Sequence, residues 1–274
     1  MTILVTGATG NVGRHLVTRL AGTGHHVRAL TRDPARAAFP EGVEVVRGDL
    51  AVPETVAPAL EGVTGLHLIT FGGDDYAELT TGPELASLAA GAGVRRITVL
   101  AGDVEESPVE KALRDAGLPF ARLAPVEFMA NALSWADQVR AEGVVRELPD
   151  RHLSPMIHEA DIADVAAVAL TEDGHGDREY WLTGPEALTM RDKLRILGEA
   201  VGREIELVEL TVDQARERWR AEGYGDEDIE FFLRMWSNPP EEAREVLPTV
   251  EEVTGRPART FAQWARENAA AFRP

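Results

Sequence analysis

Residues 3–33, ILVTGATGNVGRHLVTRLAGTGHHVRALTRD, decide the fold. Residues 3–5 are a short apolar run typical of a buried strand, and apolar residues at helical spacing follow between positions 16 and 20. A second apolar run over residues 26–31 reads as another strand. The stretch therefore predicts a strand, a glycine-rich turn, a helix and a second strand.

The turn between the first strand and the helix is almost bare backbone. Glycines alone are weak evidence, but a flanking strand and helix are the context in which such a turn binds a dinucleotide. A pyrophosphate can approach the main-chain N–H groups there, at the positive end of the helix dipole. We expect the cofactor's pyrophosphate to be held by Gly7, Thr9, Gly10, Asn11, Val12 and Gly13.

The end of the second strand indicates which dinucleotide binds. NAD sites place a carboxylate there for the ribose 2′-OH, whereas an arginine accommodates the 2′-phosphate of NADP. Here Thr31 is followed by Arg32, and Asp33 comes one residue too late. Because a guanidinium holds a phosphate bidentately, we predict that Arg32 binds the 2′-phosphate and that the cofactor is NADP rather than NAD.

The chain beyond this unit divides into two parts. Strand-like runs alternate with helical spacing through residue 124, which predicts an α/β fold with a Rossmann-like, doubly wound parallel sheet. We assign residues 1–124 and 159–184 to an NAD(P)-binding domain. Residues 125–158 and 185–274 form a smaller, mainly helical C-terminal cap for the substrate.

Three segments carry more specific secondary-structure predictions. Residues 53–62 and 77–92 are expected to be helices, and residues 144–155, with two prolines, are expected to be irregular. In the cap, apolar side chains are expected to shape a substrate pocket, although each also fits an ordinary core: Met129, Trp135, Phe232 and Trp236.

Composition excludes several classes of protein. The 274 residues contain no cysteine, which rules out disulfides and thiolate chemistry, and no run of about eighteen apolar residues that would span a membrane. The net charge of −18 argues against binding nucleic acid. The seven histidines show no metal-ligand spacing, and no signal peptide precedes the first strand, so we expect a cytoplasmic protein without a metal.

Later motifs resemble those of one family. The chain is similar to the NmrA-like, atypical branch of the short-chain dehydrogenase/reductase superfamily through the opening turn and through residues 117–119, 123–125, 128–131, 161–163, 182–185, 254–257 and 260–261. The resemblance implies NAD(P) binding and, in many relatives, reduction of quinones, dyes, imines or enones. Other relatives are redox-sensing regulators that bind the dinucleotide without turnover.

The ligand edge of such a fold supplies the remaining cofactor contacts. The resemblance implies that Asp49 and Leu50 flank the adenine. Strand ends in a parallel sheet face the ligand, so we expect Thr70, Phe71 and Gly72 at the adjoining ribose. For the same reason we expect Ala101, Pro125 and Phe128 near the nicotinamide.

The superfamily's usual proton relay is absent from this sequence. That relay is Tyr-x-x-x-Lys after a Ser or Thr at the end of the fifth strand, and general acid catalysis depends on it. Here residues 101–103 carry no hydroxyl, and Ser107 stands four residues before Lys111. We interpret Lys111 as a surface residue rather than a ribose ligand.

Three hypotheses follow for the chemistry. Hydride passes directly to an electron-poor acceptor, or another group donates the proton, or the protein binds NADP as a sensor or for a non-redox reaction. Candidate donors are Tyr76, His158 and Asp103, although each also fits a structural role. Carboxylates form a possible general-base cluster that fits a helix start equally well: Asp103, Glu105, Glu106 and Glu110.

The sequence as a whole favours an NADPH-dependent reductase of a small, conjugated molecule. The expected partner is that small-molecule substrate, without nucleic acid or membrane. A homodimer through the helices of the sheet is possible.

Overall fold

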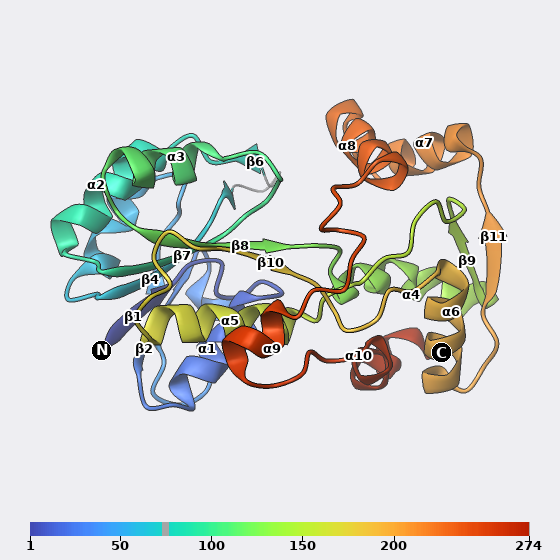
Figure 1. Cartoon of the computed structure of the whole chain (residues 1–274), viewed down its shortest axis with the longest axis horizontal. Helices are drawn as coiled ribbons and strands as arrows, with labels where there is room; N and C mark the ends of the chain where they lie inside the picture. Colours follow the sequence, from blue (N-terminus) through green and yellow to red (C-terminus); the bar gives the residue numbers. More distant parts are fainter. Residues whose placement is uncertain (73–76, 274) are drawn as a thin grey trace. The chain divides into compact units, whose positions relative to one another are not determined.

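The computed structural model describes residues 1–72 and 77–273 (Figure 1). These residues form two compact units. The first contains Met1–Pro125, Glu159–Leu182 and Thr249–Arg256. The second contains Val126–His158, Thr183–Pro248 and Pro257–Pro274.

The first unit is built on a seven-stranded parallel sheet. Its strands stand in the order β10-β8-β7-β4-β1-β2-β3. Their bounds are β1 (Thr2–Val5), β2 (His26–Thr31), β3 (Glu44–Arg47), β4 (Gly65–Ile69), β7 (Arg96–Leu100), β8 (Phe120–Pro125) and β10 (Glu179–Leu182). Leu4 of β1 lies opposite Arg28 of β2 and Leu66 of β4. The chain order reverses between β1 and β4, which is where ligands bind in a doubly wound sheet.

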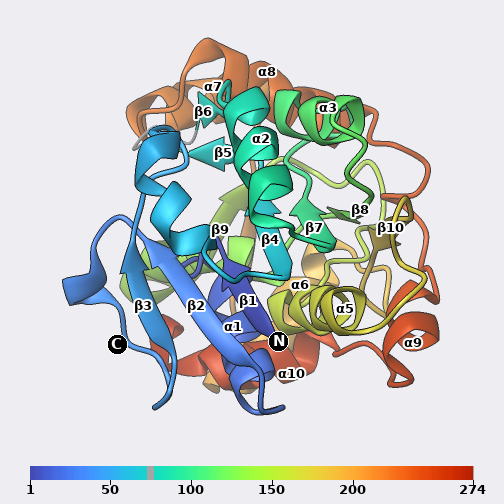
Figure 2. The same ribbon diagram turned by 90° about the vertical axis from the view of Figure 1, so that its left-hand side faces the viewer.

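Helices cover both faces of this sheet. They are α1 (Gly13–Ala21), α2 (Gly82–Ala92), α3 (Pro108–Asp115), α5 (Glu159–Thr171) and α9 (Thr249–Thr254). Figure 2 shows α2 and α3 together on one face and α1 and α5 on the other. β1 lies between the two layers, and its Ile3, Leu4 and Val5 are completely buried. The predicted Rossmann-like class is confirmed.

Two predicted helices of the first unit differ in the structure. Residues 53–62 form two short 3₁₀ turns, η2 (Pro53–Thr55) and η3 (Ala57–Leu60), because Pro58, inside the predicted helix, lacks the N–H of a continuous helix. The helix predicted from residue 77 begins only at Gly82. Residues 77 and 78 instead form the short strand β6 (Ala77–Glu78), which pairs with β5 (Phe71–Gly72).

The second unit is mainly helical but contains a small sheet. Its helical segments are η4 (Met129–Trp135), α4 (Ala136–Glu142), α6 (Met190–Val201), α7 (Val212–Ala221), α8 (Asp226–Ser237), α10 (Phe261–Asn268) and η5 (Ala269–Phe272). β9 (Val144–Glu147) pairs in parallel with β11 (Glu206–Glu209). The expectation that residues 144–155 are irregular was therefore wrong at its start. Phe261, Trp264 and Phe272 form the aromatic centre of the core.

One late segment returns to the first unit. The sequence-based division placed residues 249–256 in the cap, whereas in the structure they belong with the parallel sheet. Asp164 of α5 is buried and pairs with both Arg19 of α1 at 3.2 Å and Arg256 at 3.0 Å. This shared carboxylate fastens α1 and the end of the α9 segment to α5.

Two negative findings apply to the part of the chain that the structure describes. Among these residues, no helix is long and apolar enough to cross a membrane. Within the same residues, no group of three acidic, histidine or cysteine side chains is placed to hold a metal ion.

Candidate functional site

The turn from β1 into α1 has a backbone that only glycine can follow. Gly7 adopts a left-handed conformation with φ of +57°. A Cβ at Gly13 would lie 2.2 Å from the carbonyl oxygen of Gly7, far inside contact distance. The N–H of Gly10 donates to that same oxygen at 2.9 Å. The turn is therefore closed on itself and leaves no room for side chains at its centre.

The start of α1 is left open to a ligand. Val12 is the N-cap residue; within residues 1–72 and 77–273 no side chain caps it, and the first turn carries no acidic residue. The first N–H groups of a helix have no intrahelical partner, and the helix dipole favours an anion beside them. Thr9 and Asn11 are exposed on the turn. These features fit a dinucleotide pyrophosphate, as the sequence predicts.

An arginine is exposed at the end of β2, whereas the aspartate that follows it is engaged in a local hydrogen bond. Arg32 is exposed directly after the strand. The Asp33 side chain instead accepts a hydrogen bond from the N–H of Ala35 at 3.1 Å and so caps the 3₁₀ turn η1 (Pro34–Arg36). Arg36 lies 3.8 Å from Asp33. This arrangement favours a 2′-phosphate over an unmodified ribose.

The predicted adenine residues follow β3 as a structured turn. The N–H of Asp49 donates to Thr55 Oγ1 at 2.8 Å, and the Asp49 carboxylate accepts from the N–H of Ala51 at 3.0 Å. Leu50 is buried, and its carbonyl accepts from Thr81 Oγ1 at 2.7 Å. Both residues therefore have fixed main chains at the carboxyl end of the sheet.

The ends of β4 and β7 lie against each other. Thr70 is buried, and its hydroxyl donates to the Leu100 carbonyl at 3.5 Å. A Cβ on Gly102 would lie 3.1 Å from Thr70 Oγ1 and 3.3 Å from the ring of Phe71. The N–H of Ala101 donates to Leu123 of β8 at 2.9 Å. The structure thus brings the predicted ribose and nicotinamide residues of the first unit to one sheet edge.

The other predicted cofactor residues at this edge are Gly72 and Pro125. Gly72 belongs to β5, and Pro125 is the last residue of β8. Phe128 lies in the second unit, where its backbone forms a parallel bridge with Ile157.

The structure describes two of the three candidate proton donors. Tyr76 lies outside the described residues. Asp103 is exposed in the first unit, and its carboxylate accepts from the N–H of Val104 at 2.6 Å. His158 is buried in the second unit, with its Nε2 3.1 Å from a carboxylate oxygen of Glu267.

The predicted general-base cluster is instead a helix start. Ser107 and Glu110 form a reciprocal capping box at the beginning of α3, with the Ser107 hydroxyl donating to Glu110 Oε2 at 2.6 Å. Glu106 pairs with Arg114 on the surface. Glu105 is exposed. The hypothesis of a general base at this place is therefore not supported by the side-chain contacts.

Lys111 is the surface residue that the sequence suggests. Its Nζ lies 2.6 Å from a carboxylate oxygen of Asp115, one turn further along α3, and both side chains are about two-thirds exposed. The hydrogen bond that Lys111 donates to Asp115 raises the pKa of Lys111.

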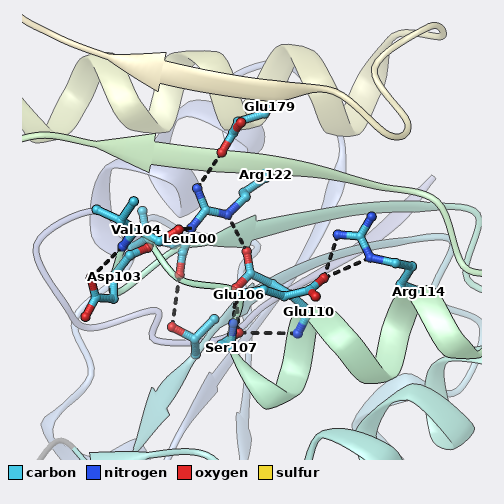
Figure 3. Close-up of polar contacts among 10 residues, drawn as sticks. Leu100, Asp103, Val104, Glu106, Ser107, Glu110, Arg114, Arg122 and Glu179 are labelled. Atoms are coloured by element: carbon cyan, nitrogen blue, oxygen red, sulfur yellow. Dashed lines mark hydrogen bonds and ion pairs between the residues drawn. The ribbon is translucent and has the colours of Figure 1, made fainter. Parts of the chain in front are cut away.

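Sequence reasoning missed Arg122 of β8, which makes the densest set of polar contacts at this edge (Figure 3). Its Nε donates to Glu110 Oε1 at 2.7 Å, and its Nη1 donates to Glu179 Oε1 of β10 at 2.6 Å. Its Nη2 donates to the carbonyl oxygens of Asp103 at 2.6 Å and Val104 at 3.2 Å. The Ser-x-x-Glu capping signal at 107–110 was readable in advance. Its arginine partner was not.

The cap residues named from the sequence lie in the second unit, in or beside its cores. Met129 and Trp135 are buried in its main core. Phe232 packs its ring against Trp219, with centroids 5.4 Å apart. Trp236 donates from Nε1 to the Pro149 carbonyl at 2.9 Å. These contacts account for the four residues as structural groups.

Comparison with known proteins gives consistent matches over the whole chain. Residues 1–100 match the model of the NmrA-like family. A (4-alkanoyl-5-oxo-2,5-dihydrofuran-3-yl)methyl phosphate reductase from Streptomyces griseus is 40% identical, with 99% of each chain covered. An NAD(P)H azoreductase from Xenophilus azovorans is 33% identical, with 98% of this chain and 99% of the relative covered.

A solved structure extends the likeness to three dimensions. The NADPH complex of the Escherichia coli quinone oxidoreductase QOR2 superposes with a TM-score of 0.81 at 23% identity, covering 97% of this chain and 99% of that one. At this level of identity the match shows the fold alone.

Proposed function

We propose a substrate class for this chain, which belongs to the NmrA-like family and is an NAD(P)H-dependent reductase with NADP as its cofactor. Its substrate carries a conjugated carbon–carbon double bond that two carbonyl groups activate, and the enzyme reduces that double bond. The observation that carries this proposal is the absence of the short-chain superfamily's usual proton relay from this sequence. Tyr-x-x-x-Lys does not occur in the sequence, and the Ser107 hydroxyl is committed to capping α3. An acceptor that needs no enzyme acid suits such a site.

NADPH, when bound, supplies the hydride. The turn of Gly7, Gly10 and Gly13 and the open start of α1 would hold its pyrophosphate, and Arg32 would hold its 2′-phosphate. The remaining task of the protein is to place the acceptor against the cofactor. Positioning of this kind accounts for a large part of the rate enhancement in enzymes.

The substrate named for the Streptomyces griseus relative has the required electronic structure. Its ring double bond is conjugated with both the lactone carbonyl and the alkanoyl carbonyl. When the carbon bearing the methyl phosphate group gains hydride, the π pair moves to the neighbouring carbon and is shared by the two carbonyl oxygens. That doubly stabilised enolate takes its proton from water. An azo group or a quinone likewise yields a stabilised anion after hydride addition.

The direct test uses a synthetic acylbutenolide, with and without the phosphate, and NADPH carrying deuterium at the transferred position. We expect one deuterium at the ring carbon that bears the methyl substituent. We also expect a primary isotope effect on turnover and a solvent isotope effect close to unity, because proton transfer to the enolate follows the hydride step. Oxidation of NADPH by a quinone panel but not by either butenolide would refute the proposed substrate class.

A second test concerns the cofactor. Replacing Arg32 by alanine removes a charge-assisted contact, so we expect the NADPH dissociation constant to rise by about 10- to 100-fold while that for NADH stays nearly unchanged. Fluorescence titration measures both constants. An equal loss for both cofactors, or no loss for NADPH, would contradict the role of Arg32.

A further inference from the structure

Arg122 occupies an unusual place in the first unit. Its side chain is only 12% exposed, and its three nitrogens are shared among two carboxylates and two main-chain carbonyls. A buried arginine of this kind costs desolvation energy unless all its partners are well placed. The carbonyl partners belong to Asp103 and Val104, in the loop that joins β7 to α3.

That loop is held from both sides. On the β4 side, Gly102 packs closely against Thr70 and Phe71. On the β8 side, the Arg122 guanidinium donates hydrogen bonds to the carbonyls of Asp103 and Val104, the residues that follow Gly102 (Figure 3). The loop therefore has one main-chain path between the two strand ends, and that path forms part of the sheet edge that receives the cofactor.

Glu110 extends this clamp to the following helix. Its side chain is 1% exposed, and it divides its two oxygens between separate donors. Oε2 accepts from the N–H of Ser107 at 2.8 Å and from its hydroxyl, whereas Oε1 accepts from Arg122. The Glu110 carboxylate thus binds two groups that hold the loop. One is Ser107, where the loop ends and α3 begins, and the other is Arg122, which binds the middle of the loop.

We propose that Arg122 is a positioning residue of the reductase, which sets the main chain of residues 101–104 against the nicotinamide half of NADPH. The inference rests on the proposed function. Side chains at this loop offer no acid of the usual kind, because Ala101 and Gly102 stand where the superfamily has a hydroxyl. The contribution of the loop is therefore the shape of its backbone, and Arg122 maintains that shape.

The test compares R122K with R96K. A lysine at position 122 can still pair with Glu110 but cannot also reach both loop carbonyls, because a single ammonium lacks the guanidinium fork. Arg96 is the first residue of β7, at the opposite edge of the same sheet, and pairs with the exposed Asp173 at 2.5 Å. R96K therefore changes the same residue type in the same sheet without touching the loop.

Kinetics give the first readout, measured well below the melting temperature of each variant. For R122K we expect kcat to fall by about 10- to 100-fold and the primary isotope effect to rise, since misplacement slows the chemical step. The NADPH dissociation constant should stay within about two-fold, because the groups that would bind its phosphates follow β1 and β2 rather than β8. R96K should match the unmodified protein. A lowered melting temperature with unchanged kcat would overturn the proposal.

Hydrogen–deuterium exchange gives a readout without turnover. In the unmodified protein and in R96K, NADPH should slow amide exchange both in residues 7–13 and in residues 101–106. In R122K the first protection should remain and the second should be lost. Equal protection of residues 101–106 in all three proteins would refute the positioning role. If none of the acceptors is reduced but this exchange pattern holds, the proposed function fails and the role of Arg122 stands.

Discussion

The helices α1 and α3 begin at the same edge of one parallel sheet, yet their first turns are opposite in character. α1 starts at Val12 without a side-chain cap among the described residues and without an acidic residue in its first turn. α3 starts with a complete capping box, in which Glu110 supplies a buried carboxylate of its own. One helix start is left for an anion from outside, and the other is filled by an anion from the chain.

The difference shows how a fold with repeated strand–helix units keeps one phosphate site. Every helix that follows a strand in such a sheet has a positive end at the ligand edge. At the start of α3, the N–H groups of Ser107 and Glu110 are bound by side chains, and the Glu110 carboxylate would repel a phosphate. Among the described residues, no side chain caps the start of α1 after the glycine turn.

The largest effect is expected from Gly13→Ala, which breaks the open site. The added Cβ would lie 2.2 Å from the Gly7 carbonyl oxygen, so the turn must distort. We expect NADPH affinity to fall by roughly 100-fold or more, together with a lower melting temperature. Gly91→Ala in α2 is the matched control, because nothing lies within 4 Å of its added Cβ. That control should leave binding unchanged, and comparable losses in both variants would argue against a special turn.

Glu110→Gln breaks the filled site instead. Removing the charge leaves the Arg122 guanidinium without its buried partner, and we expect a loss of about 3–5 kcal/mol in the free energy of unfolding. Urea denaturation measures it. Glu106→Gln, which removes an exposed partner of Arg114, should cost less than about 1 kcal/mol. Similar costs for the two changes would show that the buried contacts of Glu110 stabilise the fold no more than a surface ion pair does.

Acid should destabilise the sheet from which both helices start, because β4 lies between β1 and β7 and carries His67. Burial lowers the pKa of His67 to about 4, from an ordinary 6.5 in the unfolded chain. Between these two pKa values only the unfolded chain binds the proton. The contribution of neutral His67 to the free energy of unfolding is therefore complete above pH 6.5 and declines as the pH falls toward 4. The total loss is about 3 kcal/mol by linkage.

His67→Asn removes this titration while keeping a polar partner near Thr98, whose hydroxyl lies 2.8 Å from His67 Nδ1. Denaturation midpoints measured across the acid range should fall less steeply for the variant. Identical slopes for the two proteins would mean that other groups carry the acid sensitivity.

The smallest effect is expected from Asn11→Asp, which adds a negative charge beside the uncapped start of α1. Asn11 is exposed just before the N-cap of α1. A carboxylate there should stabilise the helix by a few tenths of a kcal/mol and weaken NADPH binding by about five-fold or more, because it would face the negative pyrophosphate of our proposal. The loss of affinity should shrink in high salt. A gain in affinity would mean that the pyrophosphate does not lie at this turn.

Local patterns predicted the fold well where neighbours in sequence decide the structure. The strand, glycine turn and helix of residues 3–21 are contiguous, so their signals survive without tertiary information. Pro58 was visible in the sequence, and its missing N–H explains why a helix was the wrong prediction there. Strand β9 was missed because its partner β11 comes about sixty residues later.

The site divides in the same way. The glycine turn and Arg32 follow from contiguous motifs. Arg122, Glu110 and Glu179 come from three separate elements, and only the folded sheet brings them within hydrogen-bond distance. His67 looked like an ordinary member of an apolar strand, because no sequence pattern distinguishes a buried imidazole from a surface one.

The order in which the chain builds its two units limits how the protein can be rearranged. Each unit consists of three segments that alternate along the chain, so the polypeptide passes between the units five times. The last return to the first unit, residues 249–256, is fastened by Arg256 to Asp164. A recombinant enzyme that borrows its second unit from a relative therefore needs five crossover points. Exchange of a single C-terminal block would also replace the segment that seals α5.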